Sequence, residues 1–263
     1  MKVSPKKSLG QHFLVDKNIL KQIVDLGNIN NRDIVIEVGP GTGNLTEHIL
    51  LKNPKKLITI EKDNNLSKLL QKKFEKRITI INEDILNIKL DNFSKNKIII
   101  FGNLPYNVSS QILAKWIKLN NLNNISKKFI LMFQKEVADR ILAKTNETNY
   151  SRLSILSSWK MNIKKIKEID PGSFRPQPKI KSSVLLMEPK KNFYKIKDPK
   201  NLEYITKVFF NQKRKMIKKP LKIIFGDFDG ITTKLKINVD LRPQNLSPLT
   251  YYKLCHEYEN LLN

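Results

Sequence analysis

The sequence predicts an α/β fold, in which helices cover a mostly parallel sheet and a small C-terminal α-helical domain follows. Three observations predict it. Short β-branched runs alternate with segments of helical spacing about every 20 to 25 residues between residues 33 and 144. A cluster of glycines stands between the first such run and the helix after it. Beyond Pro189 the β-branched runs end and helical spacing remains.

The strands are expected where apolar runs rich in isoleucine, leucine and valine end in polar or turn residues. These runs occupy residues 33–39, 56–61, 77–82, 97–101, 128–134 and 182–188. Apolar residues at helical spacing predict the intervening helices, at residues 16–26, 42–52, 65–74, 108–119 and 136–144. Because ligands of parallel sheets bind at the carboxyl ends of the strands, functional residues are expected there.

The residue pattern changes near residue 190 from β-branched runs to helical spacing, and this change predicts a domain boundary. Three prolines, Pro171, Pro176 and Pro178, indicate a turn ahead of the last strand. After it, helical spacing covers residues 202–210, 214–225 and 249–262. We therefore expect two domains, residues 1–189 and residues 190–263.

The charge of the chain is strongly positive. There are 49 Lys and Arg residues against 24 Asp and Glu, a formal net charge of +25. Arginine contributes only seven of them, and Lys, Asn and Ile, which all have A/T-rich codons, crowd the sequence. Part of the charge can therefore reflect codon drift. Charge alone leaves nucleic-acid binding, membrane-surface binding and simple solubility open.

Other features of the sequence limit its class and its cellular compartment. The single cysteine, Cys255, excludes an internal disulfide framework and a zinc ribbon. No cluster has the spacing of metal ligands, and no apolar run approaches the roughly 20 residues of a membrane span. Residues 1–14 lack the apolar stretch of a signal peptide. We expect a cytoplasmic protein without a metal.

The first motif with chemical content is Glu37-Val-Gly-Pro-Gly-Thr-Gly43, between a strand and a helix. Glycines let the backbone approach a ligand closely, and the following helix presents free N–H groups. A tight turn without a ligand is the alternative. The motif alone does not separate a nucleotide such as NAD from S-adenosylmethionine.

Two acids follow at the ends of the next two strands. Glu61 ends the run at residues 56–61, where a carboxylate can accept both hydroxyls of a ribose. Asp84 follows the run at residues 77–82 and can receive the exocyclic amine of an adenine. Taken singly, Glu61 can be a solvated acid and Asp84 a helix cap or turn residue. Their convergence with the glycine loop on one crevice favours binding.

The decisive motif is Gly102-Asn-Leu-Pro-Tyr-Asn107, after the fourth strand. The N6 amine of adenine is a poor nucleophile, because its lone pair is delocalised into the ring. Acceptors around its N–H groups can direct that lone pair, and Asn103 offers a side-chain carbonyl. Pro105 keeps the backbone rigid, so the Leu104 carbonyl can be a second acceptor. Tyr106 can stack on the base. A structural turn with a core tyrosine is the alternative.

The sequence resembles the KsgA-type ribosomal RNA adenine N6,N6-dimethyltransferases over nearly its whole length. Besides the motifs above, the resemblance includes Gly10-Gln-His-Phe-Leu14, Gln134-Lys-Glu-Val137, Ser173-Phe-Arg-Pro-Gln-Pro-Lys179 and Phe210-Asn-Gln-Lys-Arg-Lys215. It implies a Rossmann-like class I methyltransferase domain at residues 1–189, a helical RNA- and ribosome-binding domain at residues 190–263, and S-adenosylmethionine as methyl donor.

The resemblance also assigns roles by position. The residues that it places around the donor are His12, Leu14, Gly39, Glu61, Asp84 and Asn103. Those that it places around the target adenine are Asn103, Leu104, Pro105, Tyr106 and Phe174, and Tyr106 and Phe174 would enclose the base. His12 stands where many relatives carry asparagine. Two alternatives stay open: Phe174 can be a core aromatic, and Gln11 with His12 can cap a helix.

The function that the resemblance implies is dimethylation of N6 on two adjacent adenosines near the 3′ end of small-subunit (16S) rRNA. The expected partner is the immature 30S subunit, and the protein is expected to bind it as a monomer. The nearest alternative is a large-subunit rRNA adenine methyltransferase of the antibiotic-resistance type. The segments at residues 134–136 and 173–179 favour the small-subunit kind, and Leu104 disfavours a DNA methyltransferase, which usually has proline there. A ribosome-assembly factor in which methylation is secondary is the alternative of another class.

Overall fold

The computed structural model describes residues 5–6, 10–93 and 96–262. The chain separates into two compact units: Met1–Ala138 with Asn162–Pro189, and Asp139–Met161 with Lys190–Asn263. The boundary expected after residue 189 coincides with one of the crossings between them. Residues 139–161, expected in the first domain, group instead with the second unit.

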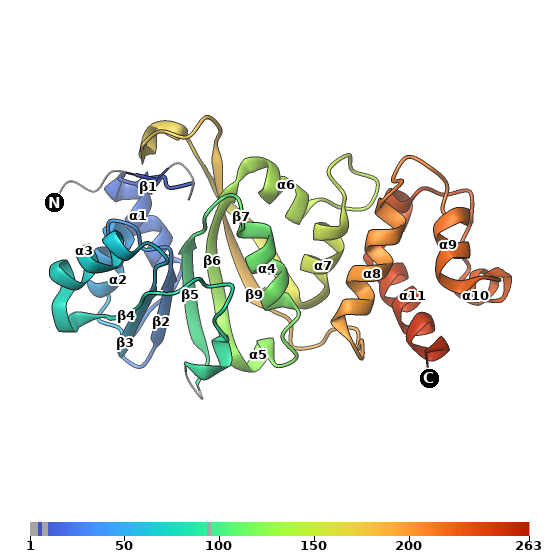
Figure 1. Cartoon of the computed structure of the whole chain (residues 1–263), viewed down its shortest axis with the longest axis horizontal. Helices are drawn as coiled ribbons and strands as arrows, with labels where there is room; N and C mark the ends of the chain where they lie inside the picture. Colours follow the sequence, from blue (N-terminus) through green and yellow to red (C-terminus); the bar gives the residue numbers. More distant parts are fainter. Residues whose placement is uncertain (1–4, 7–9, 94–95, 263) are drawn as a thin grey trace. The chain divides into compact units, whose positions relative to one another are not determined.

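The first unit is built on a sheet. Within the described residues it has seven strands in the order β4-β3-β2-β5-β6-β9-β7. In chain order they are β2 (Ile34–Val38), β3 (Lys56–Ile60), β4 (Thr79–Ile81), β5 (Ile98–Asn103), β6 (Ser126–Gln134), β7 (Met161–Ile169) and β9 (Ser182–Pro189). The first five strands of this order, from β4 through β3, β2 and β5 to β6, are parallel and lie side by side in Figure 1. Strand β9 pairs antiparallel with β6. The predicted α/β class and all six predicted strands are confirmed.

The strand order places a topological switch at β2. The chain runs from β2 outward through β3 to β4 and then returns to β5 on the other side of β2. Val38, the last residue of β2, is in register with Ile60 of β3 and with Gly102 of β5. The carboxyl ends of these three strands therefore lie level. A crevice for a ligand is expected at such a switch point.

Helices flank this sheet. They are α1 (Lys17–Asp25), α2 (Asn44–Leu50), α3 (Asn64–Phe74), α4 (Ser109–Ile117) and α5 (Leu122–Ile125), with the short 3₁₀ turns η2 (Glu75–Arg77), η3 (Leu90–Asn92) and η4 (Pro171–Ser173). Helix α6 (Lys135–Leu142) begins in this unit and ends in the second. Asp16 and Asp63 cap α1 and α3, because each carboxylate accepts two main-chain N–H groups of the first turn.

The β-branched runs are explained by burial on both faces of the sheet. Alternate residues of the central strands join a core with α1, α2 and α3, among them Val35, Ile99 and Ile130. Their neighbours in the strands are equally buried, and the Phe129 ring meets that of Trp116 in α4 at 5.5 Å between centroids. Strands buried on both faces read as continuous apolar runs, which is why the sequence predicts them.

Several elements escaped prediction. Strand β7 is rich in lysine because it lies at the sheet edge, where exposed lysines oppose pairing with another chain. The two-residue strands β1 (Phe13–Leu14) and β8 (Phe174–Arg175) pair with each other and are too short to have a pattern. In the second unit, α9 begins at Lys218 although residues 214–225 were expected to be helical.

The second unit is helical. Its helices are α7 (Arg152–Lys160), α8 (Pro199–Phe210), α9 (Lys218–Phe225), α10 (Asp229–Leu235) and α11 (Pro248–Leu261), with the turn η5 (Pro243–Asn245). Tyrosine hydroxyls connect its core, since Tyr150 donates to the Leu246 carbonyl at 3.0 Å and Tyr252 to that of Ile155 at 2.9 Å. In neither unit is a described helix both long and apolar enough to cross a membrane.

Candidate active site

A crevice of about 840 Å³ opens at the carboxyl ends of the strands in the first unit. Five segments line it: residues 10–13, the glycine loop after β2, the residues that follow β3, those that follow β4, and residues 103–108 at the end of β5. The four strand ends at which the sequence predicted functional residues therefore meet in one place.

The glycine loop approaches β5 so closely that a side chain at Gly39 would be crowded. Gly39 has φ +69°, and a Cβ built there would lie 3.1 Å from the Asn103 carbonyl oxygen. Its N–H donates to the Ile60 carbonyl at 3.0 Å, which ties the loop to the end of β3. Gly39 is thus required both by its left-handed backbone and by the close contact with Asn103.

Glu61 is buried beneath this loop. Its Oε2 accepts the Gly41 N–H at 3.2 Å and its Oε1 accepts the Asp63 N–H at 2.9 Å. Burial raises the pKa of Glu61, and the two N–H groups oppose that rise. Each carboxylate oxygen has a second lone-pair direction, so Glu61 can accept two further hydrogen bonds from a ligand in the crevice.

Asp84 lies across the crevice at the end of β4. Its Oδ1 accepts the Leu86 N–H at 2.9 Å, and its Oδ2 accepts from the Lys62 ammonium at 2.8 Å. Burial tends to raise the pKa of Asp84, but the hydrogen bonds from Lys62 and Leu86 outweigh it and lower the pKa. Lys62 lines the crevice and was missed in the sequence; its place directly after Glu61 at a strand end was the available signal.

Asn103 ends β5 with a fixed amide orientation. Its Nδ2 donates to the His12 carbonyl at 2.8 Å, so its Oδ1 is directed away from that bond. Within the described part of the chain, neither this Oδ1 nor the main-chain oxygen of Leu104 accepts a hydrogen bond. The site therefore offers two free carbonyl acceptors on consecutive residues beside the crevice.

Tyr106 is held at two points. Its hydroxyl shares a hydrogen bond of 2.7 Å with Ser182 Oγ at the start of β9, and its ring stacks on that of His12 with 5.6 Å between centroids. His12 Nδ1 in turn lies 2.8 Å from the Pro176 carbonyl oxygen. Burial raises the pKa of Tyr106, so this phenol stays protonated. The ring is thereby held as a flat apolar wall of the crevice.

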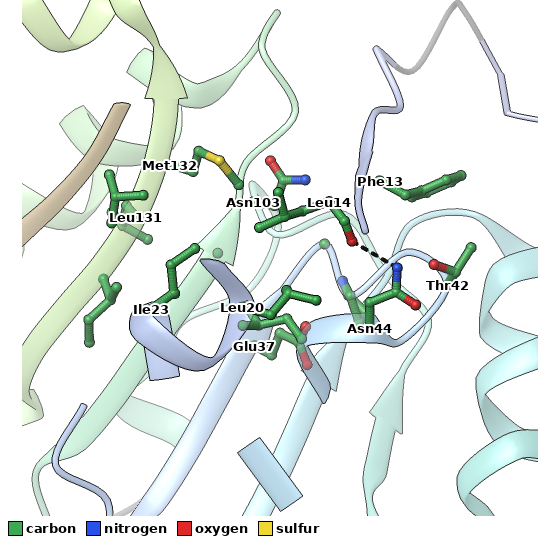
Figure 2. A pocket seen from close by; sticks show the side chains of 16 residues that line it. Phe13, Leu14, Leu20, Ile23, Glu37, Thr42, Asn44, Asn103, Leu131 and Met132 are labelled. Atoms are coloured by element: carbon green, nitrogen blue, oxygen red, sulfur yellow. Dashed lines mark hydrogen bonds between the residues drawn. The ribbon is translucent and has the colours of Figure 1, made fainter. Parts of the chain in front are cut away.

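Leu14 belongs to a neighbouring cavity of about 470 Å³, which shares Gly39 and Asn103 with the crevice. Figure 2 shows Leu14, Asn44 and Asn103 around it, with the Leu14 carbonyl accepting the Asn44 side-chain amide at 2.8 Å. Glu37 also lines it, fully buried. Burial raises the pKa of Glu37 to about 8, and Thr46 Oγ1 donates to its Oε2 at 2.7 Å. Glu37 stood in the glycine motif but was given no role.

Phe174 is not brought to the site. The pairing of β8 with β1 sets it opposite Leu14, and its side chain is completely buried in the core that also contains Ile169 and Val184. It lines neither cavity. The expected enclosure of a base between Tyr106 and Phe174 therefore does not match this structure, and the alternative of a core aromatic describes the position of Phe174.

The chain is similar to known proteins over nearly its whole length. The family model of ribosomal RNA adenine dimethylase matches residues 3–260. Ribosomal RNA small subunit methyltransferase A of Pelagibacter ubique (strain HTCC1062) is 54% identical over 261 residues, 99% of each chain. The protein of that name from Ehrlichia ruminantium (strain Gardel) is 43% identical over 93% of this chain and 94% of its own.

Solved structures share the architecture. A dimethyladenosine transferase from Plasmodium falciparum superimposes with a TM-score of 0.77 at 27% identity, over 94% of this chain and 98% of that one. The 23S rRNA methyltransferase ErmE superimposes with a TM-score of 0.68 at 18% identity, over 94% of this chain and 99% of that one. This likeness shows a common fold. The expected class I methyltransferase fold is thereby confirmed. Since the family model spans almost every residue that builds the sheet, the crevice and the second unit, the chain belongs to the ribosomal RNA adenine dimethylase family.

Proposed function

We propose that this protein transfers methyl groups from S-adenosylmethionine to N6 of two adjacent adenosines near the 3′ end of 16S rRNA, without a metal. Membership of the adenine dimethylase family supports the reaction. The names of relatives that are 54% and 43% identical support the small subunit as the source of the RNA. We place the reaction in the cytoplasm, on an immature 30S subunit bound by one copy of the protein.

The crevice and its neighbouring cavity suit the donor. S-adenosylmethionine supplies a methyl group on a positively charged sulfur. Glu61 would bind the ribose hydroxyls and Asp84 the adenine amine. Gly39 would line the amino-acid part, and His12 and Leu14 would border the methionine and adenosine parts. The missing side chain at Gly39 supports this fit, because a Cβ there would lie 3.1 Å from the Asn103 carbonyl oxygen and crowd the wall that the two cavities share.

The free carbonyl oxygens of Asn103 and Leu104 would receive the two N6–H groups of the target adenine. This arrangement draws the nitrogen lone pair out of the ring and directs it along one line. Pro105 restricts the backbone between them, and Tyr106 offers its ring as a stacking surface. The amine proton becomes acidic once the nitrogen is alkylated and can leave to water. Catalysis would then consist of positioning and preorganised polar groups.

The observation that carries this proposal is the amide orientation of Asn103. A side-chain amide can direct either its oxygen or its nitrogen at a ligand, and the two have opposite effects on an amine. The hydrogen bond from Nδ2 to the His12 carbonyl at 2.8 Å leaves the oxygen for the ligand. Only this orientation accepts an N–H group from adenine.

The test is methylation of 30S subunits from a strain without the modification. With labelled S-adenosylmethionine, the wild-type protein should add four methyl groups to two adjacent adenosines, which mass spectrometry of rRNA fragments identifies. Asn103→Ala should add none while it still binds the donor. Near-normal dimethylation by Asn103→Ala would exclude the acceptor role.

The same assay separates the alternatives. A large-subunit enzyme would instead label 23S rRNA when 50S subunits or free 23S rRNA are offered. For a protein that acts mainly in assembly, Asn103→Ala would restore growth of a deletion strain without restoring methylation.

We propose residues 190–263 as an RNA-binding domain, with the functional division after residue 189, and expect lysines of both domains to bind RNA phosphates. Residues 190–263 contain 16 Lys and Arg residues against seven Asp and Glu residues. Such a surplus would bind phosphates without reading sequence. Binding should therefore weaken steeply as the salt concentration rises, and binding of 30S subunits that did not depend on salt would contradict this role.

A further inference from the structure

Lys62 and Asp84 form an ion pair at the mouth of the donor crevice. Lys62 is the second residue after β3, Asp84 follows β4, and both line the crevice. The ammonium nitrogen lies 2.8 Å from Asp84 Oδ2, with the Lys62 side chain 62% exposed and that of Asp84 24% exposed. The pair thus stands at the solvent edge of the crevice, with its acid reaching inward.

This ion pair uses the acceptor that the adenine amine needs. The other oxygen of Asp84, Oδ1, accepts the Leu86 N–H at 2.9 Å and so holds the following turn. Each oxygen keeps a second lone-pair direction, and an amine that approaches Oδ2 meets the Lys62 ammonium, which already donates there. Ammonium and amine are both donors, so they compete for one carboxylate oxygen.

We propose that Lys62 is a specificity-determining residue of the donor site, whose ammonium competes with the adenine amine for Asp84. This inference rests on the proposed role of Asp84 toward adenine. Two consequences follow from the chemistry. The donor binds less tightly than it would to Asp84 alone, and the ammonium can donate to a carbonyl at position 6 of a purine, so discrimination against a hypoxanthine analogue is reduced.

The competition is moderate in size. The pair is open to solvent on the lysine side, and exposed ion pairs contribute little because water and salt screen them. Removing the competitor should therefore tighten binding by about two- to five-fold rather than by orders of magnitude. The expected change has a defined sign, tighter binding of the adenine compound, and calorimetry can measure it.

The test uses Lys62→Met, which removes the charge and keeps an unbranched stem. Lys234→Met is the matched control, because Lys234 is 61% exposed and its ammonium pairs with Glu257 at 2.8 Å in the other unit. The probes are S-adenosylhomocysteine and S-inosylhomocysteine, which differ in the amine or carbonyl at the purine ring, and calorimetry gives their Kd values.

We expect Lys62→Met to bind the adenine compound about two- to five-fold more tightly and to raise its preference over the inosine compound. Lys234→Met should match the wild type. Equal or weaker binding of the adenine compound by Lys62→Met would overturn the proposal, as would an unchanged preference.

Failure of the underlying assignment is seen separately with Asp84→Asn. An amide can donate to the inosine carbonyl, so this variant should shift the preference toward the inosine compound. If Asp84→Asn keeps the wild-type preference, Asp84 is not the adenine acceptor, whatever the result for Lys62→Met.

Discussion

The side-chain amide of Asn103 donates to the main-chain oxygen of His12 at 2.8 Å, across 91 residues of sequence. This bond joins the N-terminal segment to the end of β5, and it decides which atom of the amide faces the crevice. His12 is itself stacked on Tyr106, two residues from the Leu104 carbonyl. The acceptors and the stacking wall of the proposed target site are therefore oriented by one segment.

Asn103→Asp tests this orientation. The variant keeps an oxygen acceptor but loses the donor, so a carboxylate would face the His12 carbonyl and repel it. We expect kcat for methylation to fall by about 10²–10³-fold, as when a preorganised polar group is removed from a catalytic site. Single-turnover methylation of 30S subunits measures it. Activity close to that of the wild type would show that the His12 contact does not set the orientation.

Glu61→Ala should weaken donor binding. The change removes the proposed ribose acceptor and leaves the buried N–H groups of Gly41 and Asp63 without their partner. Hydrogen bonds to a charged group contribute about 1.5–3 kcal/mol each, so a loss of roughly 10- to 100-fold in affinity is expected. Calorimetry with S-adenosylhomocysteine measures it, and an unchanged Kd would remove Glu61 from the ribose site.

Gly39→Ala should damage the site, and Gly226→Ala is its control. Both glycines have a positive φ, +69° and +70°, which disfavours alanine at either position. A Cβ built at residue 226 would meet nothing within 4 Å, whereas a Cβ at residue 39 would lie 3.1 Å from the Asn103 carbonyl oxygen. Both variants should lose stability in urea unfolding, but only Gly39→Ala should also lose donor affinity and methylation. Equal activity of the two would contradict the close-approach argument.

Glu37→Gln should change how stability depends on pH. The pKa of Glu37 is raised from 4.5 to about 8 in the folded protein, so between these values the folded state holds a proton that the unfolded state has released. The contribution of Glu37 to stability therefore falls as the pH rises from about 4.5 to about 8. Glutamine is neutral throughout and still accepts from Thr46.

Urea unfolding of both proteins at pH 5, 6.5 and 8 checks the Glu37 prediction. The variant should gain stability relative to the wild type as the pH rises, because every other titrating group is common to the two proteins. A constant difference across this range would mean that Glu37 is ionised in the folded state.

The sequence predicted the sheet and the site to different degrees. Strands such as β2 and β5 were found because burial on both faces leaves them no polar alternation. Gly39, Glu61, Asp84 and Asn103 followed from them, since parallel strands that end level must bring their next residues together. Strand topology, and not a long-range contact, carried that information.

What the sequence did not reveal depends on pairing between distant segments. The ring of Phe174 belongs to the core because β8 pairs with β1, and two-residue strands leave no periodic signal. Lys62 looks like any solvent-facing lysine until β4 brings Asp84 to within 2.8 Å of its ammonium. Strand β7 is rich in lysine and lacks the apolar pattern of a strand, and it forms one because it pairs at the edge of the sheet.

The grouping of residues 139–161 with the C-terminal unit has a consequence for synthesis on the ribosome. Helix α7 is made before α8 and α11, yet its Trp159 donates to the Tyr194 carbonyl at 2.7 Å and Tyr252 donates to its Ile155 carbonyl at 2.9 Å. Trp159 is thus made 35 residues before its partner and Ile155 97 residues before its own, so α7 lacks both contacts until nearly the whole chain is complete. A fragment ending at Pro189 would carry that unburied helix permanently, so a protease-resistant methyltransferase core is expected from excision of residues 139–161 and not from simple truncation.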